Sequence, residues 1–388
     1  MTHKSKADTV IVHAGLHPHD NHGVPNPPIY RASTILRPTI DAYEHPDDPF
    51  PYGRDGTPTT RALEEAITAL ENAAGTVLTP SGLSAITLTV LAYVDHGGHI
   101  LITDSVYPPV RKFVTQRLTR MGIDVEFYDP RIGVGIADII RDDTWLIWME
   151  TPGFGTFELP DIPAIVSAAQ ARGVPTAIDS TWGAGYYLKP LDLGVDVSVQ
   201  SASKYISGHS DMLMGVIACG EDSLPRIKKE RSLLGICVSP DEAYLAQRGL
   251  RSMAARLVRH QENGFKIARW FEERPEVKRV LHPGLESHPD HALWKRDFTG
   301  ACGLFSIVLE TSDRKAACAM VDGLKFFGIG ASWGGFESLA VFQYPNRTRT
   351  VVPWTDDSIV LRFHIGLENP DDLIADLEDG FRRLNASV

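Results

Sequence analysis

Lys204 has the surroundings of a lysine that forms a covalent bond with a carbonyl group. It follows an apolar strand in the segment QSASKYISGHSD, residues 200–211, and ligands of open α/β sheets bind in the crevice at the carboxyl ends of the strands. An amine buried there has a lowered pKa and can form an imine. Ser201 and Ser203 can donate hydroxyls to a phosphate. The alternative interpretation is a surface lysine in a polar loop, and this segment alone does not exclude it.

Two other segments carry groups that complement such a lysine. PSGLSAI, residues 80–86, joins a strand to an apolar helix. Its Gly82 permits close backbone approach, and the helix N-terminus offers N–H groups to a phosphate. In AIDSTWGAG, Asp179 ends a strand, where a carboxylate can keep a pyridine nitrogen protonated. Each segment also suits a plain structural role, either as a strand-to-helix turn or as an Asp that caps a turn.

The order of the three segments is more specific than any one of them. A phosphate-binding turn comes first, then a strand-end Asp, and then a lysine 25 residues after that Asp (204 − 179). This spacing leaves room for one intervening strand. The sequence therefore predicts a cofactor site in which Lys204, Asp179 and the Gly82 turn meet.

The elements that must position these residues alternate between strand and helix. Apolar strands are predicted at GTVLTP, HILITD, VEFYD, TWLIWME, PTAIDS, DVSVQ and MGVIACG, with helices between them. Such alternation favours a mostly parallel sheet covered by helices on both faces. The pattern changes to α+β near residue 250. We predict an N-terminal arm over residues 1–58, a large cofactor-binding domain over 59–250 and a small domain over 251–388.

Composition excludes several classes of protein. The net charge of −11 disfavours nucleic acid and anionic membranes as partners. The four cysteines show no CxxC spacing, and no apolar run reaches the ~18 residues of a membrane span. A cytoplasmic location is therefore expected. Four histidines gather in the arm (His13, His17, His19 and His22), but no acid or Cys cluster completes a metal site, so no metal is expected.

The chain resembles the Cys/Met-metabolism family of fold-type I enzymes that use pyridoxal 5′-phosphate (PLP). The resemblance is carried by YGRDGTPTTRALEEAI, TDSVYPPV, SASKYISGHSD with the upstream Asp, SWGGFESL and LRFHIGLENPDDLIADLEDGF, and it runs nearly end to end. It implies an aspartate-aminotransferase-like fold with a mostly parallel sheet, a smaller α+β domain and an extended arm. It also implies a homo-oligomer, a tetramer built as a dimer of dimers, in which the arm contacts the neighbouring subunit.

The resemblance implies a role for each matched residue. Lys204 would form the Schiff base with PLP and then transfer protons, Asp179 would pair with the pyridine nitrogen, and Tyr107 would stack on the ring. The residues implied at the cofactor phosphate are Gly82, Leu83, Ser201 and Ser203, with Tyr52 and Arg54 supplied by a neighbouring subunit. Arg362 would bind the substrate α-carboxylate, helped by Ser332 and Trp333.

The implied reaction is α,β-elimination of a sulfur-containing amino acid, L-cystathionine, which yields homocysteine, pyruvate and ammonia. Trp333 favours this β-acting branch, because γ-acting relatives usually carry leucine there. The alternatives are a γ-acting member, a cysteine-conjugate β-lyase and a non-catalytic regulator with the same fold. A nicotinamide-dependent dehydrogenase is disfavoured because no GxGxxG follows the first strands. Asp55 and Lys112 depart from close relatives, which carry an arginine and an acid there, and they leave the preferred substrate open.

Overall fold

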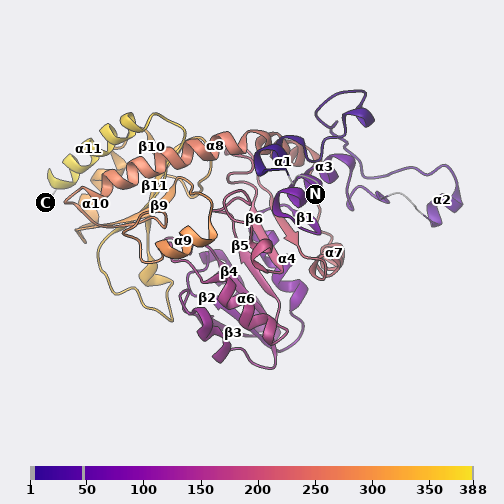
Figure 1. Ribbon diagram of the computed structural model, residues 1–388, viewed down its shortest axis with the longest axis horizontal. Helices are drawn as coiled ribbons and strands as arrows, with labels where there is room; N and C mark the ends of the chain where they lie inside the picture. Colours follow the sequence, from indigo (N-terminus) through magenta and orange to yellow (C-terminus); the bar gives the residue numbers. More distant parts are fainter. Residues whose placement is uncertain (1–4, 46–48, 387–388) are drawn as a thin grey trace.

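The computed structural model describes residues 5–45 and 49–386, and its core consists of two β-sheets that lie side by side (Figure 1). The seven-stranded sheet has the order β1-β7-β6-β5-β4-β2-β3. Its strands are β1 (Gly75–Thr79), β2 (His99–Thr103), β3 (Asp124–Tyr128), β4 (Thr144–Glu150), β5 (Thr176–Asp179), β6 (Val197–Ser201) and β7 (Gly215–Cys219). Only β7 runs antiparallel to its neighbours. The predicted α/β fold with a mostly parallel sheet is therefore confirmed.

Helices cover both faces of this sheet because its strands are apolar on both sides. Ile100 and Ile102 of β2 point into one buried cluster, and Leu101 between them points into another. The covering helices are α3 (Pro58–Glu71), α4 (Gly82–Tyr93), α5 (Pro108–Phe113), α6 (Ile162–Ala171) and α7 (Ser223–Leu233). Short 3-10 or π segments lie at Pro18–Asn21, Val114–Leu118, Thr119–Met121, Gly133–Asp138, Pro190–Leu193 and Pro345–Arg347.

The second sheet has five strands in the order β10-β11-β12-β9-β8 and is mainly antiparallel. Its strands are β8 (Val277–Leu281), β9 (Leu304–Leu309), β10 (Phe327–Gly328), β11 (Ser338–Gln343) and β12 (Val360–His364). Helices α9 (His291–Asp297), α10 (Arg314–Asp322) and α11 (Pro370–Ala386) accompany it. The C-terminal region is therefore the smaller α+β unit that the sequence predicts.

One long helix, α8 (Pro240–Glu272), runs along both sheets (Figure 1). Ser239 caps its start by accepting a hydrogen bond from the Asp241 N–H. Leu250 and Leu257 pack into the core of the large sheet, whereas Ile267 and Phe271 pack into the core of the small one. The predicted boundary after residue 250 falls inside this helix, and the domain limits stay a prediction.

The first helix of the predicted N-terminal arm packs on the body of its own chain. Helix α1 (Ala7–His13) lies against α3 and α8, its Ile11 is fully buried, and Arg251 donates to the carbonyl oxygens of Ile11 and Ala14. Beyond it the chain extends away from the body and carries the short α2 (Ile40–Glu44) (Figure 1). Residues 1–4 and 46–48 of the predicted arm, and 387–388 of the predicted small domain, lie outside the described residues.

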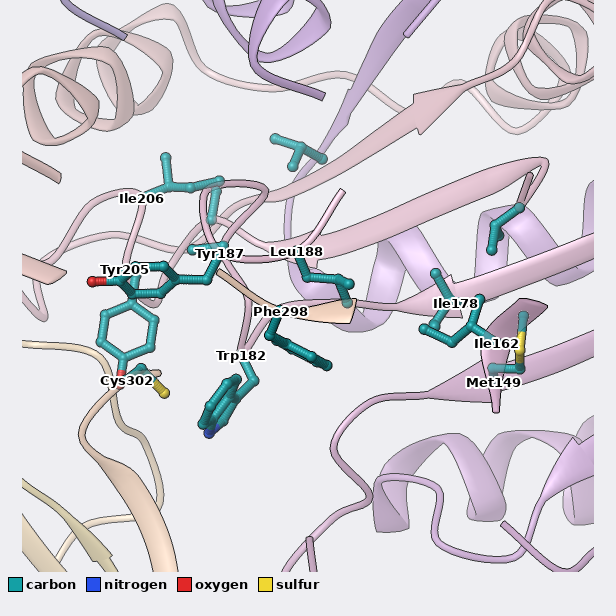
Figure 2. Packing of buried hydrophobic residues seen from close by; sticks show 14 of the residues in the cluster. Met149, Ile162, Ile178, Trp182, Tyr187, Leu188, Tyr205, Ile206, Phe298 and Cys302 are labelled. Carbon is teal, nitrogen blue, oxygen red and sulfur yellow. The ribbon is translucent and has the colours of Figure 1, made fainter. Parts of the chain in front are cut away.

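The core under the carboxyl ends of the strands contains large aromatic groups. Trp182, Tyr187, Tyr205, Phe298 and Cys302 gather on one side, and Met149, Ile162 and Ile178 lie further along the sheet (Figure 2). Trp182 donates its indole N–H to the carbonyl oxygen of Leu304 and so ties the two sheets together. Within the described ranges, no helix combines the length and the hydrophobicity of a membrane span.

Candidate active site

A cavity of about 420 Å³ opens where the parallel strands of the large sheet end. The ends of β4, β5 and β6 form its floor, the N-terminus of α4 forms one wall, and residues 331–333 with Arg362 close it from the small sheet. This position is the crevice where open α/β sheets bind ligands. Ten of the twelve predicted site residues line it, namely Gly82, Leu83, Tyr107, Asp179, Ser201, Ser203, Lys204, Ser332, Trp333 and Arg362.

Lys204 lies in the turn after β6, and its amine faces this cavity. Nζ donates a hydrogen bond of 2.7 Å to Ser332 Oγ and lies 5.6 Å from the centre of the Trp333 ring. Burial, and next the charge of Arg362, lower the pKa of Lys204 from 10.5 to about 8, although Asp179 opposes the shift. The amine therefore has a substantial neutral fraction near physiological pH, which nucleophilic attack and proton transfer both require.

The N-terminus of α4 presents backbone donors to one end of the cavity. Ser81 caps the helix by accepting from the Ser84 N–H, which leaves the N–H groups of Gly82 and Leu83 without partners inside the helix. A Cβ at position 82 would lie 2.6 Å from the Cβ of Ser201, so only glycine allows this approach. Ser203 lies beside them, and its hydroxyl accepts from the Met214 N–H. Together these groups give this end of the cavity donors that can bind an anion.

Asp179 and a second carboxylic acid, Glu150, lie deeper in the cavity. They are paired positions on neighbouring parallel strands. Asp179 Oδ1 accepts from both the N–H and the hydroxyl of Thr181, at 3.0 and 2.6 Å. Among the described residues, Oδ2 receives no hydrogen bond, so it is open to a donor in the cavity. Burial raises the pKa of Asp179, and burial together with the Asp179 charge raises that of Glu150 well above its ordinary value.

Tyr107 and Phe154 form an aromatic wall. Tyr107 precedes α5, and its backbone N–H donates to Glu150 Oε2 at 2.7 Å. Its ring centre lies 5.4 Å from that of Phe154, which in turn lies 5.8 Å from the guanidinium carbon of Arg362. A flat heteroaromatic ligand can pack against such a wall.

Arg362, on β12, is a buried cation without a carboxylate partner. It is 4% exposed, and Nη2 donates only to the carbonyl oxygens of Ser332 and Ala331, at 3.2 and 3.4 Å. No Asp or Glu in the described part of the chain forms an ion pair with it. Burial lowers its pKa to about 10. A buried guanidinium is costly unless it is paired, so this position favours an anionic ligand group.

Tyr52 and Arg54 lie outside this cavity, on the extended segment between α2 and α3. Arg54 stacks over the Tyr52 ring at 5.4 Å, and its carbonyl oxygen accepts from Arg231. Neither residue reaches the cavity of its own chain. Asp55 and Lys112 also lie outside the lining. A role for Tyr52 and Arg54 in a neighbouring copy therefore stays a prediction.

Glu150, Phe154 and Thr181 are among the cavity residues that were not singled out from the sequence. Glu150 ends the strand TWLIWME as Asp179 ends its own strand. The position at a strand end, which indicated Asp179 as a site residue, was therefore sufficient to indicate Glu150 as well. Thr181 follows Asp179 by two residues, a spacing at which a hydroxyl can bond the carboxylate. Phe154 has no sequence signal, because an aromatic residue in a loop equally suits a core position.

Comparison with known proteins identifies close relatives. A model of the family described as Cys/Met metabolism PLP-dependent enzyme matches residues 8–382. The chain is 48% identical to a putative cystathionine beta-lyase of Rhizobium johnstonii, over 98% of this chain and 96% of that protein. It is 39% identical to cystathionine beta-lyase MetC of Escherichia coli, over 98% and 99%. The structure of a cystathionine gamma synthase from Xanthomonas oryzae in complex with cystathionine matches with a TM-score of 0.91 and 31% identity, over 99% and 100%.

The groups in the cavity fit the cofactor that this family uses. The unpartnered N–H groups of Gly82 and Leu83 suit its phosphate, and the open Oδ2 of Asp179 suits its pyridine N–H. The amine of Lys204 suits its aldehyde, and the Tyr107 ring suits its flat face. The phosphate, the pyridine nitrogen and the aldehyde of PLP therefore each have a partner of the right chemistry among the residues present.

Proposed function

This chain belongs to the Cys/Met metabolism family of PLP-dependent enzymes, and from this premise we propose that it cleaves the Cβ–S bond of L-cystathionine by α,β-elimination. The products are homocysteine, pyruvate and ammonia, with one water consumed. The β-lyase names of two of its relatives support this choice. So does Trp333, which lines the cavity beside Lys204.

The unpaired Arg362 is the observation that carries the proposal. Its guanidinium lies in the same cavity as the amine of Lys204 and the carboxyl of Asp179. An α-amino acid brings the missing carboxylate, which a guanidinium binds through two parallel hydrogen bonds. Binding there holds the substrate Cα close to Lys204, because Ser332 contacts both Lys204 and Arg362.

Different residues around the cavity have different roles in the proposed reaction. PLP, when bound, supplies an electron sink for the charge that develops at Cα. Asp179 keeps its negative charge next to the pyridine nitrogen and so holds a proton there. The neutral amine of Lys204 removes the Cα proton, and the thiolate then leaves from Cβ. Tyr107 and Phe154 exclude water from the side of the cavity that they cover, which strengthens the contact of Arg362 with the carboxylate.

We propose that the enzyme is a homotetramer, a dimer of dimers, in which each site receives Tyr52 and Arg54 from a neighbouring copy. The support is that these side chains are exposed, as are the apolar Leu36, Ile40 and Tyr43 of the same segment. A cytoplasmic role in methionine biosynthesis is consistent with four free cysteines and with homocysteine as a product. Asp55 and Lys112 are proposed to adjust the preference for the distal end of the thioether.

The test is to incubate the purified protein, loaded with PLP, with L-cystathionine and to assay both keto acids and both thiols. Pyruvate with homocysteine is the expected result. Formation of 2-oxobutyrate with cysteine would contradict the proposal and assign γ-elimination instead. A Lys204→Ala control is expected to lose turnover and the visible absorbance of the bound cofactor. Parallel assays with S-substituted cysteines measure whether a cysteine conjugate is the better substrate.

A further inference from the structure

The loop between β10 and β11 determines where the amine of Lys204 is held. Ser332 accepts the hydrogen bond from Nζ, and Trp333 packs over the same amine. Gly334 has a positive φ of 82°, and a Cβ there would lie 3.0 Å from the Cα and Cβ of Lys204. The loop backbone therefore packs directly on the lysine, and a small movement of the loop displaces the partner of the amine.

Two side chains of β12 hold this loop from below. Arg362 donates to the carbonyl oxygen of Ser332. His364 Nε2 lies 3.1 Å from the N of Gly334 and 3.1 Å from the carbonyl oxygen of Gly335. Residues two apart on a strand point to the same side, so both side chains project from one face of β12. Arg362 therefore holds the loop at Ser332, and His364 holds it at Gly334 and Gly335.

His364 is suited to this contact because it is neutral. It is 1% exposed, and its ring packs against His260 and Tyr205, with centres 5.2 and 6.0 Å away. Burial lowers its pKa well below 6.5, and the neighbouring His260, Arg362 and Lys204 lower it further. With a lone pair at Nε2 the ring accepts from Gly334, and with a proton there it donates to Gly335. Either tautomer therefore ties the imidazole to the backbone of the loop.

We propose that His364 is a positioning residue, which fixes the Trp333–Gly335 backbone and through it places Ser332 against Lys204 and the carboxylate-binding face of Arg362. The imidazole touches neither the cavity nor a substrate, so it acts only through the loop. The inference relies on Lys204 and Arg362 forming the amino-acid site of the proposed function, but not on cystathionine being the amino acid.

The experiment compares His364→Gln with His364→Asn and His364→Leu in the full-length protein loaded with PLP. The Gln amide reaches the position of Nε2 and can accept or donate there, whereas the Asn amide is too short and Leu has no polar group. The probe is L-alanine, which carries the carboxylate and the amine but no thioether. Its binding is followed through the visible absorbance of the cofactor, together with the pH midpoint of that absorbance in the absence of L-alanine.

We expect the Kd for L-alanine to rise about tenfold in His364→Asn and His364→Leu, the effect of one lost buried hydrogen bond, and the pH midpoint to move with it. His364→Gln should stay within about threefold of the unmodified protein. If Leu prevents folding, the Asn and Gln pair alone decides the matter. Normal L-alanine binding in His364→Asn would overturn the proposal, and so would a Gln variant as impaired as Asn. Because no thioether is used, these results are independent of the cystathionine assay.

His282 provides a matched control. It is fully buried, and its Nδ1 accepts from the Gly284 N–H at 3.0 Å, a bond of the same kind outside the cavity lining. His282→Leu is expected to lower the melting temperature as His364→Leu does, but to leave the Kd for L-alanine unchanged. An equal rise of that Kd in both Leu variants would show a general effect of core damage and would overturn the specific role of His364.

Discussion

Two buried arginines of the C-terminal region, Arg349 and Arg362, differ in what neutralises them. Arg349 is 9% exposed, and its Nη2 lies 2.6 Å from Glu158 Oε1 and also donates to Thr156. Arg362 is more deeply buried, at 4% exposed, but its hydrogen bonds go only to carbonyl oxygens. One cation is paired by the protein itself, and the other is proposed to receive its carboxylate from a ligand. Burial alone therefore does not separate a structural arginine from a binding one. A missing carboxylate does so only together with a position in the cavity, because Arg256 is also 8% exposed and donates only to Ser252 Oγ and carbonyl oxygens, yet it lies outside the cavity lining.

The largest expected effect comes from removing the unpaired arginine. Arg362→Leu should lower kcat/KM for an amino-acid substrate about 10²–10³-fold, because the substrate carboxylate loses a charged, desolvated partner worth ~3–4 kcal/mol. Steady-state kinetics measure this loss. The free energy of unfolding should not fall, since an unpaired buried charge is removed. A variant that keeps normal kcat/KM would contradict the assignment of Arg362.

Removing the paired arginine should affect stability instead. Arg349→Leu leaves Glu158 buried without its cation, and we expect a loss of about 3 kcal/mol in the free energy of unfolding. Chemical denaturation measures it. The Kd for L-alanine, measured on the folded protein, should stay close to normal, because Arg349 is outside the cavity lining. A weakened Kd with unchanged stability would reverse the roles assigned to the two arginines.

Lys204 carries a partly buried amine, and its charge should make the stability of the protein depend on pH. Its pKa falls from 10.5 in the unfolded chain to about 8 in the fold, so between pH 8 and 10.5 the unfolded state binds more protons and stability rises with pH. Without PLP, Lys204→Met should be more stable than the unmodified chain below pH 8, by on the order of 2 kcal/mol. The difference should shrink towards pH 10.5, as followed by denaturation at several pH values. In an Arg362→Leu background the lower edge of this pH range should rise and the range should narrow, because one cause of the lowered pKa of Lys204 is gone.

The smallest effect is expected for a double substitution. Arg349→Leu with Glu158→Leu removes both members of the buried pair, and its cost should be below about 1.5 kcal/mol, since an apolar pair of similar size often replaces an ion pair with little loss. A double-mutant cycle with the two single variants measures the coupling. If the losses in the free energy of unfolding were strictly additive, the two groups would not stabilise each other. Arg349 could then no longer be contrasted with Arg362 as an arginine that the protein itself neutralises.

The sequence predicted the large sheet well because its strands are short runs of apolar residues between turns, as in HILITD. It did not indicate β8, where VKRVL carries two cations and is partly exposed, the two-residue β10, or β11. The change of pattern predicted near residue 250 falls inside α8, although Ser239 and Pro240 are a strong signal for the start of this helix. The packing of α1 was missed because Ile11 stands among polar and small residues, and only contacts with distant helices bury it.

The candidate site was predictable where a residue type is tied to one strand end or one glycine turn, as for Lys204, Asp179 and Gly82. Glu150 has the same strand-end position but no accompanying motif. His364 could not be found, because its role depends on the path of a loop about 30 residues earlier in the chain. Tyr52 and Arg54 lie outside their own cavity, and a single chain cannot show what they contact in an assembly.

Helix α8 has a consequence for how the molecule unfolds. Its first half fills the core of the large sheet and its second half fills the core of the small one. If one core unfolds, the half of α8 that packs in it loses its contacts and unfolds too. The other half of α8 is then destabilised, because the helical turns next to it are lost. The two sheets are thus joined by a shared element rather than by a hinge of loop residues. We expect them to behave as one cooperative unit, so that the chain cannot be divided near residue 250 into two fragments that fold independently.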